Sequence, residues 1–472
     1  MWPKTGPADR ISNPTIVRTH PRWPPDRSEP LLWCPRPLAD RGTEPHPECE
    51  ITLPEGTDWE SAGRASAVMV NLARDFYSFA QCLLWARQHR MRILLAPDRE
   101  SAAALLGHLP LPAPSFLFCE ETDLPADTPP ATPPPDPPPP REDDRPVKSL
   151  PRGRIALWSS GTTQSPGLHY KSWTQLLESA DAVSRRVRIR DFSHVLSTVP
   201  PYHLYGLEHG LFMPWRNGVS LYRKRLFFPS DVREAASLGT HAVLVTTPFH
   251  LRALVESGLT VTGLGLIICS TAPLSTALAR ESEQRFKVPV MEVYGSTETG
   301  ALATRRTVRE EPWHLLDHVS VSRLEGRPCV IRRRTGTARF LDDEVEVLDS
   351  SHLCLLGRRQ DILKVAGRRA SLAALNHALL EIPGVKSGAF YQPREQETRG
   401  EPERLVAFVT APGVSEKWIL AQLRKRIDGI FLPRPLIVVE DIPHLPTGKI
   451  SHAVLAGLYR EHVLVPADST SR

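Results

Sequence analysis

The sequence has 472 residues, of which 41% are hydrophobic and 24% charged, and this composition is typical of a globular protein with two or three domains. The net charge of +5 is small and the basic residues are scattered, which favours a solvated surface over a nucleic-acid-binding face. The seven cysteines show no CxxC pairing and no zinc spacing, the N-terminus lacks an apolar signal core, and no apolar run reaches the ~18 residues that span a bilayer. These features predict a cytoplasmic protein without a membrane span.

The first predicted elements follow an irregular N-terminal segment. Residues 1–56 are rich in Pro, Arg and Asp and show no sustained hydrophobic period, so we interpret them as irregular. Buried-strand patterns at 67–72 and 91–96 flank a helix pattern at 76–89, and a further helix opens at 101–107. This strand–helix–strand order predicts a parallel sheet with crossover helices.

Residues 124–151 differ from their surroundings because they include the proline run at 132–140. Proline has no backbone donor and a fixed backbone angle, so this segment cannot join a helix or the interior of a sheet. Polyproline II is the expected conformation. We interpret the segment as a surface loop or spacer; the alternative is a ligand for a proline-binding module.

Two loops rich in glycine and hydroxyl residues follow predicted strands. A strand at 154–158 leads into Ser-Ser-Gly-Thr-Thr-Gln-Ser-Pro-Gly at 159–167, and a strand at 288–293 leads into Tyr-Gly-Ser-Thr-Glu-Thr-Gly at 294–300. Backbone N–H groups and short hydroxyls can bind phosphate, and the carboxylate of Glu298 suits Mg²⁺. Each loop alone is also compatible with an ordinary turn, and the GxxxxGK[ST] spacing is absent.

The remaining elements are predicted from apolar runs and helix caps. They comprise helices at 173–183, 371–380 and 415–427, strands at 194–200, 242–248, 264–269, 405–409 and 436–439, and a hairpin around 345–355. His203 stands between aromatic residues at the start of another helix, where it either lines a pocket for an organic acid or is simply packed.

Four motifs together resemble the adenylate-forming (AMP-binding) superfamily in their order and approximate spacing: 159–167, 294–300, 357–369 and 446–449. This superfamily includes acyl- and aryl-CoA synthetases, luciferase-like enzymes and the adenylation domains of peptide synthetases. The resemblance, which spans about residues 67–458, implies an α/β fold. A large N-terminal domain of parallel or mixed sheets with packed helices is expected at 57–356, and a small mobile α+β domain at 357–472.

A narrower resemblance rests on further segments. Residues 200–208, 294–300 and 432–435 look like those of acyl-CoA synthetases from aryl-polyene and xanthomonadin-type pigment pathways, and residues 70–79 are similar to their early strand and helix. This similarity implies an aryl or related unsaturated carboxylic acid as the substrate.

The resemblance implies an acid–thiol ligase. Such an enzyme uses ATP and Mg²⁺ to convert a carboxylic acid into an acyl-adenylate with release of pyrophosphate, and a thiol then displaces AMP. The thiol belongs to CoA or to the phosphopantetheine of an acyl carrier protein. Two alternatives stay open, namely an enzyme that stops at the acyl-adenylate and a degenerate nucleotide-binding protein.

The resemblance also assigns residues to the nucleotide. The β- and γ-phosphates are expected to contact Ser160, Gly161, Thr162 and Thr163. Adenine is expected between Tyr294, which Gly295 and Ser296 follow, and the opposite wall of Ser270, Thr271 and Ala272. Thr297 would contact the α-phosphate, Glu298 would hold Mg²⁺, and Arg358 would reach the ribose.

Three further residues are assigned to catalysis by the same resemblance. Lys449 would bridge the substrate carboxylate and the phosphate during adenylation, and His203 would lie beside the acyl pocket. Arg369 would support one of two orientations of the small domain. Rotation of that domain would bring either Lys449 or residues 365–367, which would line the thiol tunnel, to the site.

The sequence also departs from the superfamily pattern. Gln164 and Gly167 stand where the phosphate loop usually has glycine and lysine, and Lys171 is close enough to replace that lysine if the loop moves. Thr337 stands where relatives hold the ribose with a carboxylate, and Asp342–Asp343 are stand-ins at unusual spacing. These departures bear on catalytic efficiency more than on the fold.

Overall fold

The computed structural model describes most of the chain from residue 154 to residue 464 and shorter stretches before it. The described residues are 16–17, 32–33, 68–71, 75–76, 79–80, 83, 86–87, 92–97, 101, 116–119, 154–159, 167–309, 312–359, 362–365, 368–393, 404–445 and 450–464. The predicted proline-rich segment at 124–151 and the loop residues 160–166 lie outside this description.

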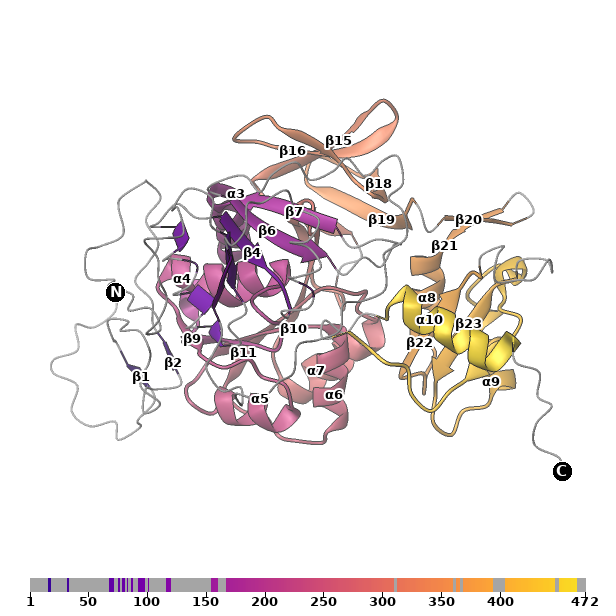
Figure 1. The fold of residues 1–472 in the computed structure, drawn as a ribbon. Coiled ribbons are helices and arrows are strands. Elements are labelled where there is room, and N and C mark those ends of the chain that lie inside the picture. The colour runs from indigo at the N-terminus through magenta and orange to yellow at the C-terminus, as the bar shows by residue number, and fades with distance from the viewer. Residues whose placement is uncertain are drawn as a thin grey trace.

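The largest sheet is mixed, and its order in the described chain is β1-β2-β9-β8-β10-β11-β12-β13-β14-β19-β18 (Figure 1). The four successive pairs from β9 to β12 in this order are parallel, whereas the β2–β9 pair and the pairs from β12 to β18 are antiparallel. In sheet order, the strands are β1 (Ile16–Val17), β2 (Leu32–Trp33), β9 (Ser220–Tyr222), β8 (His194–Ser197), β10 (Ala242–Thr246), β11 (Leu264–Cys269), β12 (Val290–Ser296), β13 (Gly300–Arg305), β14 (Trp313–Leu315), β19 (His352–Arg358) and β18 (Asp343–Val347). The predicted central strands and the hairpin around 345–355 are confirmed.

A second sheet has the order β5-β3-β4-β6-β7. Its strands are β5 (Phe116–Cys119), β3 (Val68–Asn71), β4 (Arg92–Leu95), β6 (Arg154–Ser159) and β7 (Gly167–Ser172). Strands β3 and β4 are parallel, as predicted, and β5 and β6 extend the parallel pairing, although β5 was not predicted. Strand β7 runs antiparallel to β6 and was not predicted either. It was missed because glycine, serine and proline before it made the whole segment look like a loop.

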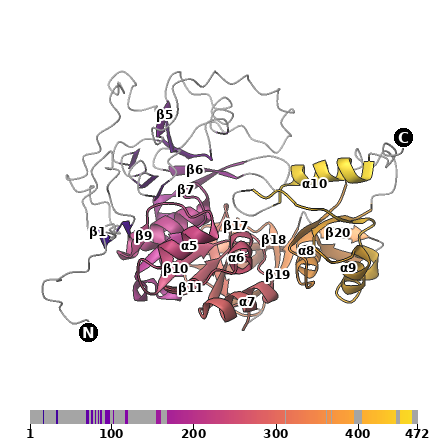
Figure 2. The same ribbon diagram turned by 90° about the horizontal axis from the view of Figure 1, so that it is seen from below.

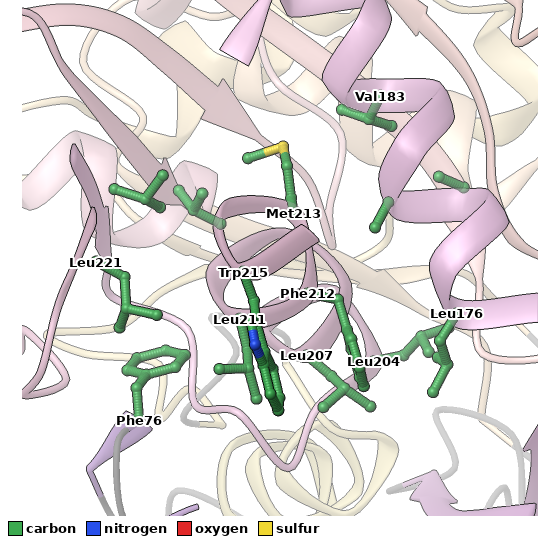
Figure 3. Packing of buried hydrophobic residues seen from close by; sticks show 14 of the residues in the cluster. Phe76, Leu176, Val183, Leu204, Leu207, Leu211, Phe212, Met213, Trp215 and Leu221 are labelled. Carbon is green, nitrogen blue, oxygen red and sulfur yellow. The ribbon is translucent and has the colours of Figure 1, made fainter. Parts of the chain in front are cut away.

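Helices between the two sheets form the main core. They are α3 (Trp173–Val187), the π-helix η2 (Gly206–Phe212) and α4 (Met213–Asn217), with the short η1 (Ile189–Asp191) after α3. Helix α3 begins at Ser172, whose side chain accepts from the Gln175 backbone N–H in a capping box. Figure 3 shows Phe212 and Trp215 in the same buried cluster as Leu176 of α3, and the ring centroids of the two aromatic residues are 6.0 Å apart.

The other hydrophobic cluster of the main sheet involves three further helices: α5 (Pro229–Ala236), α6 (Pro248–Glu256) and α7 (Thr276–Phe286). Their apolar residues pack against β10, β11 and β12, and β10 is buried along its whole length. Helix α6 begins at Thr247 and α7 at Ser275, and each of these side chains accepts a backbone N–H of the first turn. At the carboxyl ends of β11 and β12, the chain turns toward a cavity.

The C-terminal elements gather beside this body, as Figures 1 and 2 both show. They comprise the hairpin β20 (Ile362–Val365) and β21 (Arg368–Ser371), the sheet β22 (Ser387–Tyr391), β23 (Val406–Thr410) and β24 (Leu436–Val438), and the helices α8 (Leu372–Leu380), α9 (Glu416–Leu423), η3 (Gly429–Phe431), α10 (His452–Tyr459) and η4 (Arg460–Leu464). Another small sheet contains β15 (Val319–Leu324), β16 (Arg327–Arg332) and β17 (Ala338–Phe340). The predicted helices begin at their Ser371 and Ser415 caps, but α9 ends at Leu423, before the expected 427.

The α/β fold with mixed sheets and packed helices is confirmed, whereas the division into domains at residues 56 and 356 stays a prediction. Within the described residues, no helix combines the length and apolar character needed to cross a membrane.

Candidate active site

A cavity of about 1840 Å³ lies where β11 and β12 end. Ligands of open α/β sheets bind outside the carboxyl ends of parallel strands, and this cavity has that position. Part of the lining comes from the ends of these strands, including Tyr294 on β12 and Thr271 just after β11. Another part comes from C-terminal elements, including Ala374 on α8, Tyr391 on β22 and Leu455 on α10.

The heptapeptide 294–300 is the tight end of a β-hairpin and not the open loop that the sequence suggested. Strand β12 continues through Ser296, and β13 begins at Gly300. Ser296 and Thr299 close the turn, because each backbone N–H donates to the other residue's hydroxyl oxygen. Gly300 has φ +76°, a backbone angle that glycine adopts without strain. The hairpin presents Thr297 and Glu298 to the cavity.

The two predicted adenine walls face the same cavity. Tyr294 is buried, its hydroxyl donates to Asp343 Oδ2 at 2.7 Å, and its ring lies 5.5 Å from that of Trp313. On the other wall, Ser270 donates to the backbone oxygen of Val293 at 2.7 Å, which ties the end of β11 to β12. Thr271 has φ +83°, an angle that non-glycine residues rarely adopt outside functional loops. A binding role for these residues stays a prediction.

Thr337 does not lie where the sequence analysis expected it. It is exposed in the turn between β16 and β17, its hydroxyl is 2.7 Å from that of Thr335, and it is not among the described residues that line the cavity. The turn is closed by local hydrogen bonds, which explains why it stays at the surface. Asp342 and Asp343 do line the cavity, so they are the better candidates for a ribose-binding carboxylate.

Glu298 and His169 meet at the edge of the cavity. Glu298 Oε1 is 3.3 Å from His169 Nε2, and the two side chains are 31% and 20% exposed. Burial lowers the pKa of His169, while the negative charge of Glu298 opposes this effect. The imidazole therefore faces the carboxylate mainly in its neutral form.

Glu298 also fits the metal that the fold implies. Mg²⁺ in nucleotide sites is usually held by one or two carboxylates together with substrate phosphates and water. A single accessible carboxylate at the cavity edge matches this requirement. The described residues contain no cluster of three His, Cys, Asp or Glu side chains that would form a metal site without a nucleotide.

The segment that leads into η2 forms a further part of the cavity lining. His203 is half-buried, lines the cavity and lies 5.1 Å from the ring of Tyr202. Tyr205 donates from its hydroxyl to the backbone oxygen of Ile268 at 2.9 Å. His209, which the sequence analysis missed, is 1% exposed and donates from Nδ1 to the Tyr205 backbone oxygen at 3.2 Å. Burial lowers the pKa of His209 to about 4, so this imidazole is neutral at pH 7.

Several predicted site residues lie outside the part of the chain that the structure describes. Those whose structure is not described are Ser160, Gly161, Thr162, Thr163 and Lys449, whereas Arg358 and Arg369 lie on β19 and β21 without a described side chain. His444 and Ile450, which lie on either side of residues 446–449, both line the cavity. The chain segment that carries Lys449 thus begins and ends at the cavity.

A set of buried polar side chains lies beneath the hairpin turn, namely Lys171, Ser179, Glu208 and Arg332, and this grouping was not predicted from the sequence. Lys171 is 3% exposed on β7, and its Nζ donates to the backbone oxygen of Glu298 at 2.8 Å. It is therefore not available to replace a lysine of the phosphate loop. The period of two residues in β7 would have placed Lys171 on the same face as His169, had that strand been predicted.

A match to a protein family covers the part of the chain that carries this fold and most of the cavity. The sequence profile of the family described as "AMP-binding enzyme" matches residues 64–356, which is more than half of the chain. The chain belongs to the AMP-binding enzyme family. The predicted superfamily is thereby confirmed, and the matched residues contain the hairpin with Glu298 and most of the described cavity.

Several curated relatives of this chain are named as CoA ligases. A 4-coumarate–CoA ligase of Cereibacter sphaeroides is 26% identical over 313 residues, which cover 64% of this chain and 71% of that protein. A medium-chain fatty-acid–CoA ligase of Escherichia coli is 22% identical over 342 residues, which cover 63% of this chain and 60% of that protein. The prediction of an enzyme of the acid–thiol ligase kind agrees with these names.

Solved structures agree on the fold. ATP-bound MatB from Rhodopseudomonas palustris has a TM-score of 0.65 at 16% identity and covers 84% of this chain and 90% of its own. The o-succinylbenzoate CoA synthetase of Bacillus subtilis, solved with an acyl-adenylate, has a TM-score of 0.64 at 15% identity, with 84% and 89% covered. At these identities the likeness supports the AMP-binding fold alone.

Proposed function

We propose that this AMP-binding enzyme activates a carboxylic acid with ATP to an acyl-adenylate, releases pyrophosphate, and transfers the acyl group to a thiol. The observation that carries the proposal is the cavity itself, in which Tyr294, residues 270–272 and Glu298 line one continuous space. An aromatic wall suits a nucleobase, and a carboxylate suits the metal of a metal–nucleotide complex. When bound, Mg²⁺ would neutralise negative charge on the phosphates.

The chain's own residues would orient the reactants. Tyr294 is fixed by its hydrogen bond to Asp343, so its ring offers a rigid face to adenine. The closed turn holds Thr297 beside Glu298, where its hydroxyl can donate to a phosphate oxygen. His203 and Tyr205 would shape the acyl side, on which a bound acid must present its carboxylate to the α-phosphate.

Lys449 would supply positive charge where the carboxylate meets the α-phosphate. Support comes from His444 and Ile450, because both line the cavity and they leave only five residues between them. The expected result of Lys449→Ala is the loss of adenylation, about 10²-fold or more, with thiol transfer from a supplied acyl-adenylate retained. Single-turnover assays of the two half-reactions measure this, and equal losses in both would contradict the assignment.

We propose an aryl or related unsaturated acid as the substrate. The support is the aromatic character of the acyl side and the 4-coumarate–CoA ligase names of several relatives. The narrower resemblance to pigment-pathway synthetases stays a prediction that points to the same acids. CoA or a carrier-protein phosphopantetheine would be the thiol acceptor.

Acid-dependent ATP–pyrophosphate exchange tests the proposal. The panel contains hydroxybenzoic, cinnamic, medium-chain fatty and amino acids, followed by CoA and a phosphopantetheinylated carrier protein as acceptors. Exchange with the aromatic acids supports the proposed function, and exchange without transfer to either thiol identifies an enzyme that stops at the acyl-adenylate. Absence of exchange in a folded protein that binds ATP would refute the function and favour a degenerate nucleotide-binding protein.

A further inference from the structure

The hairpin turn that carries Glu298 rests on two buried cations from distant parts of the chain. Lys171 on β7 donates from Nζ to the backbone oxygen of Glu298, and Arg332 at the end of β16 donates from Nη2 to the backbone oxygen of Thr299. Both distances are 2.8 Å. Hydrogen bonds from a charged donor are roughly twice as strong as neutral ones, so these two bonds hold the turn firmly.

Glu208 and Ser179 complete this support from the helices. The Oγ of Ser179 accepts from the backbone N–H of Ala301 at 2.9 Å. Glu208 is 2% exposed, and a Cβ added to Gly300 would lie 3.0 Å from its Oε1. Burial raises the pKa of Glu208, an effect that the positive charge of Lys171 opposes. We call Lys171, Ser179, Glu208 and Arg332 the turn-supporting cluster.

Lys171 and Arg332 donate to the turn, and this direction excludes a second phosphate-binding site formed by their side chains. Neither Lys171 nor Arg332 is among the described residues that line the cavity, and both donate to carbonyl oxygens of the turn. Each cation also has an acidic neighbour: Glu208 exerts the largest charge effect on Lys171, and Glu178 lies 3.5 Å from Arg332. Two buried cations with these partners act on the protein backbone and not directly on a ligand.

We propose that Lys171 and Arg332 are positioning residues that set the place of Glu298 and Thr297 for the metal–nucleotide complex. The inference rests on the proposed function, since it assumes that this turn meets Mg·ATP. The physical reason is geometric. The carbonyl oxygens of Glu298 and Thr299 belong to the backbone that carries the Glu298 side chain, so their displacement moves the carboxylate. A misplacement of about 1 Å at a reacting group lowers rates roughly 10²-fold.

The test compares Lys171→Met, which removes the donor, with Lys171→Gln, which keeps an N–H donor without the charge. Arg332→Met and Arg332→Lys form the matching pair on β16. Arg216→Met is the control, because Arg216 forms a similarly sheltered ion pair with Asp181, which ties α4 to α3 and not to the turn. Each full-length variant is titrated calorimetrically with ATP in Mg²⁺ and with ATP in EDTA, and its thermal unfolding is recorded.

We expect the wild type to bind ATP more tightly with Mg²⁺ than without it. Lys171→Met and Arg332→Met should reduce this metal preference about 10-fold and lower kcat of the exchange reaction about 10²-fold, with KM for the acid nearly unchanged. Lys171→Gln and Arg332→Lys should recover part of both losses. Arg216→Met should keep the wild-type preference even where its Tm falls.

Two results overturn the inference in different ways. If both Met variants lose thermal stability but retain the metal preference and kcat, the cluster is only structural. If the Met variants do not fold, Lys171→Gln and Arg332→Lys are used for the test instead. The inference is then overturned if these two variants have the same metal preference as Arg216→Met. A wild-type protein that binds no ATP under either condition refutes the proposed function itself, which separates that failure from a failure of the inference alone.

Discussion

Glu298 is the residue on which the proposed metal chemistry depends. Its carboxylate lies at the cavity edge beside His169, and its backbone oxygen is bound by Lys171. We expect Glu298→Gln to lower acid-dependent exchange about 10²-fold, because the amide keeps the shape but removes the negative charge that suits Mg²⁺. Steady-state exchange at several Mg²⁺ concentrations measures the effect, and part of the loss should be recovered at high Mg²⁺.

Glu344→Gln is the matched control for this substitution. Glu344 pairs with Arg323 and Arg359 and is not among the described cavity-lining residues. Its loss should leave the Mg²⁺ dependence unchanged. Wild-type exchange and Mg²⁺ dependence in the Glu298→Gln variant would remove Glu298 from the metal site.

His209 makes the stability of the protein depend on pH. Its pKa in the folded state is about 4, below the ordinary value of 6.5, because burial disfavours the charged imidazole. The contribution of His209 to the free energy of unfolding is therefore complete above pH 6.5 and is lost as the pH falls toward 4. Between pH 6.5 and pH 5 the loss is about 2 kcal/mol, since one pKa unit corresponds to about 1.4 kcal/mol.

Urea unfolding at pH 7, 6 and 5 checks this expectation in the wild type and in His209→Gln. The variant should lose about 2 kcal/mol less than the wild type between pH 6.5 and pH 5. His250 and His318, whose pKa values burial also lowers to about 4, remain in both proteins and provide the common background. Parallel losses in the two proteins would show that His209 does not carry this pH dependence.

At the scale of elements, the β12–β13 hairpin needs glycine at residue 300. The backbone there has φ +76°, and an added Cβ would lie 3.0 Å from Glu208 Oε1 and 3.2 Å from Ser179 Oγ. Gly300→Ala should therefore combine backbone strain with a steric collision, destabilise the fold by about 2–3 kcal/mol and lower exchange at least about 10-fold. Chemical denaturation and the exchange assay measure the two effects.

Gly336→Ala separates the strain from the collision. Gly336 has φ +67°, but an added Cβ there would meet nothing within 4 Å. This variant should lose only about 1 kcal/mol and keep full exchange activity. If the two alanine variants behave alike, contacts beneath the turn do not constrain it.

Elements with a strong local signal could be predicted, whereas β7 is one of those whose weak signal gave no prediction. Strands such as β10 are apolar throughout because both faces are buried, and α9 begins at a serine cap, so each was recognisable. Strand β7 follows a glycine- and proline-containing loop and mixes His169 and Lys171 with smaller residues, so it looked like more loop. Missing that strand also hid the inward direction of Lys171.

The residues of the candidate site, too, could be predicted only where their signal is local in the sequence. Residues on the ends of β11 and β12 were found because their motif is contiguous in the sequence. The turn-supporting cluster was not found, because Lys171 lies 127 positions from Glu298 and Arg332 lies 33 from Thr299. No local pattern connects side chains at such separations; only the packing of β7 and β16 beneath the hairpin does.

On the scale of the whole molecule, the described contacts between the C-terminal elements and the body include a hydrogen bond, an ion pair and a ring stack. The N–H of Thr276, at the start of α7, donates to Glu381 Oε1 at 2.7 Å, and Lys386 pairs with Glu256 at 3.1 Å. The rings of Phe249 and His444 stack 4.5 Å apart. The Lys386 pair is exposed and contributes little, whereas the Glu381 carboxylate meets the positive end of a helix dipole.

Weakening this interface should affect the two half-reactions differently. The described arrangement brings His444 and Ile450, on either side of the Lys449 segment, to the cavity, so we associate it with adenylation. Glu381→Ala removes a hydrogen bond worth about 1 kcal/mol and should lower single-turnover adenylation roughly 5-fold. Thiol transfer from a supplied acyl-adenylate should stay the same or rise, because that step would use the other orientation.

Glu416→Ala is the control for Glu381→Ala, since Glu416 is exposed in the first turn of α9 and no described contact joins it to the body. It should leave both half-reactions unchanged. A matched fall in adenylation and thiol transfer with Glu381→Ala would mean that Glu381 supports folding and not a particular orientation. Unchanged adenylation would mean that the Phe249–His444 stack holds the arrangement without it, because Lys386 and Glu256 are too exposed to do so.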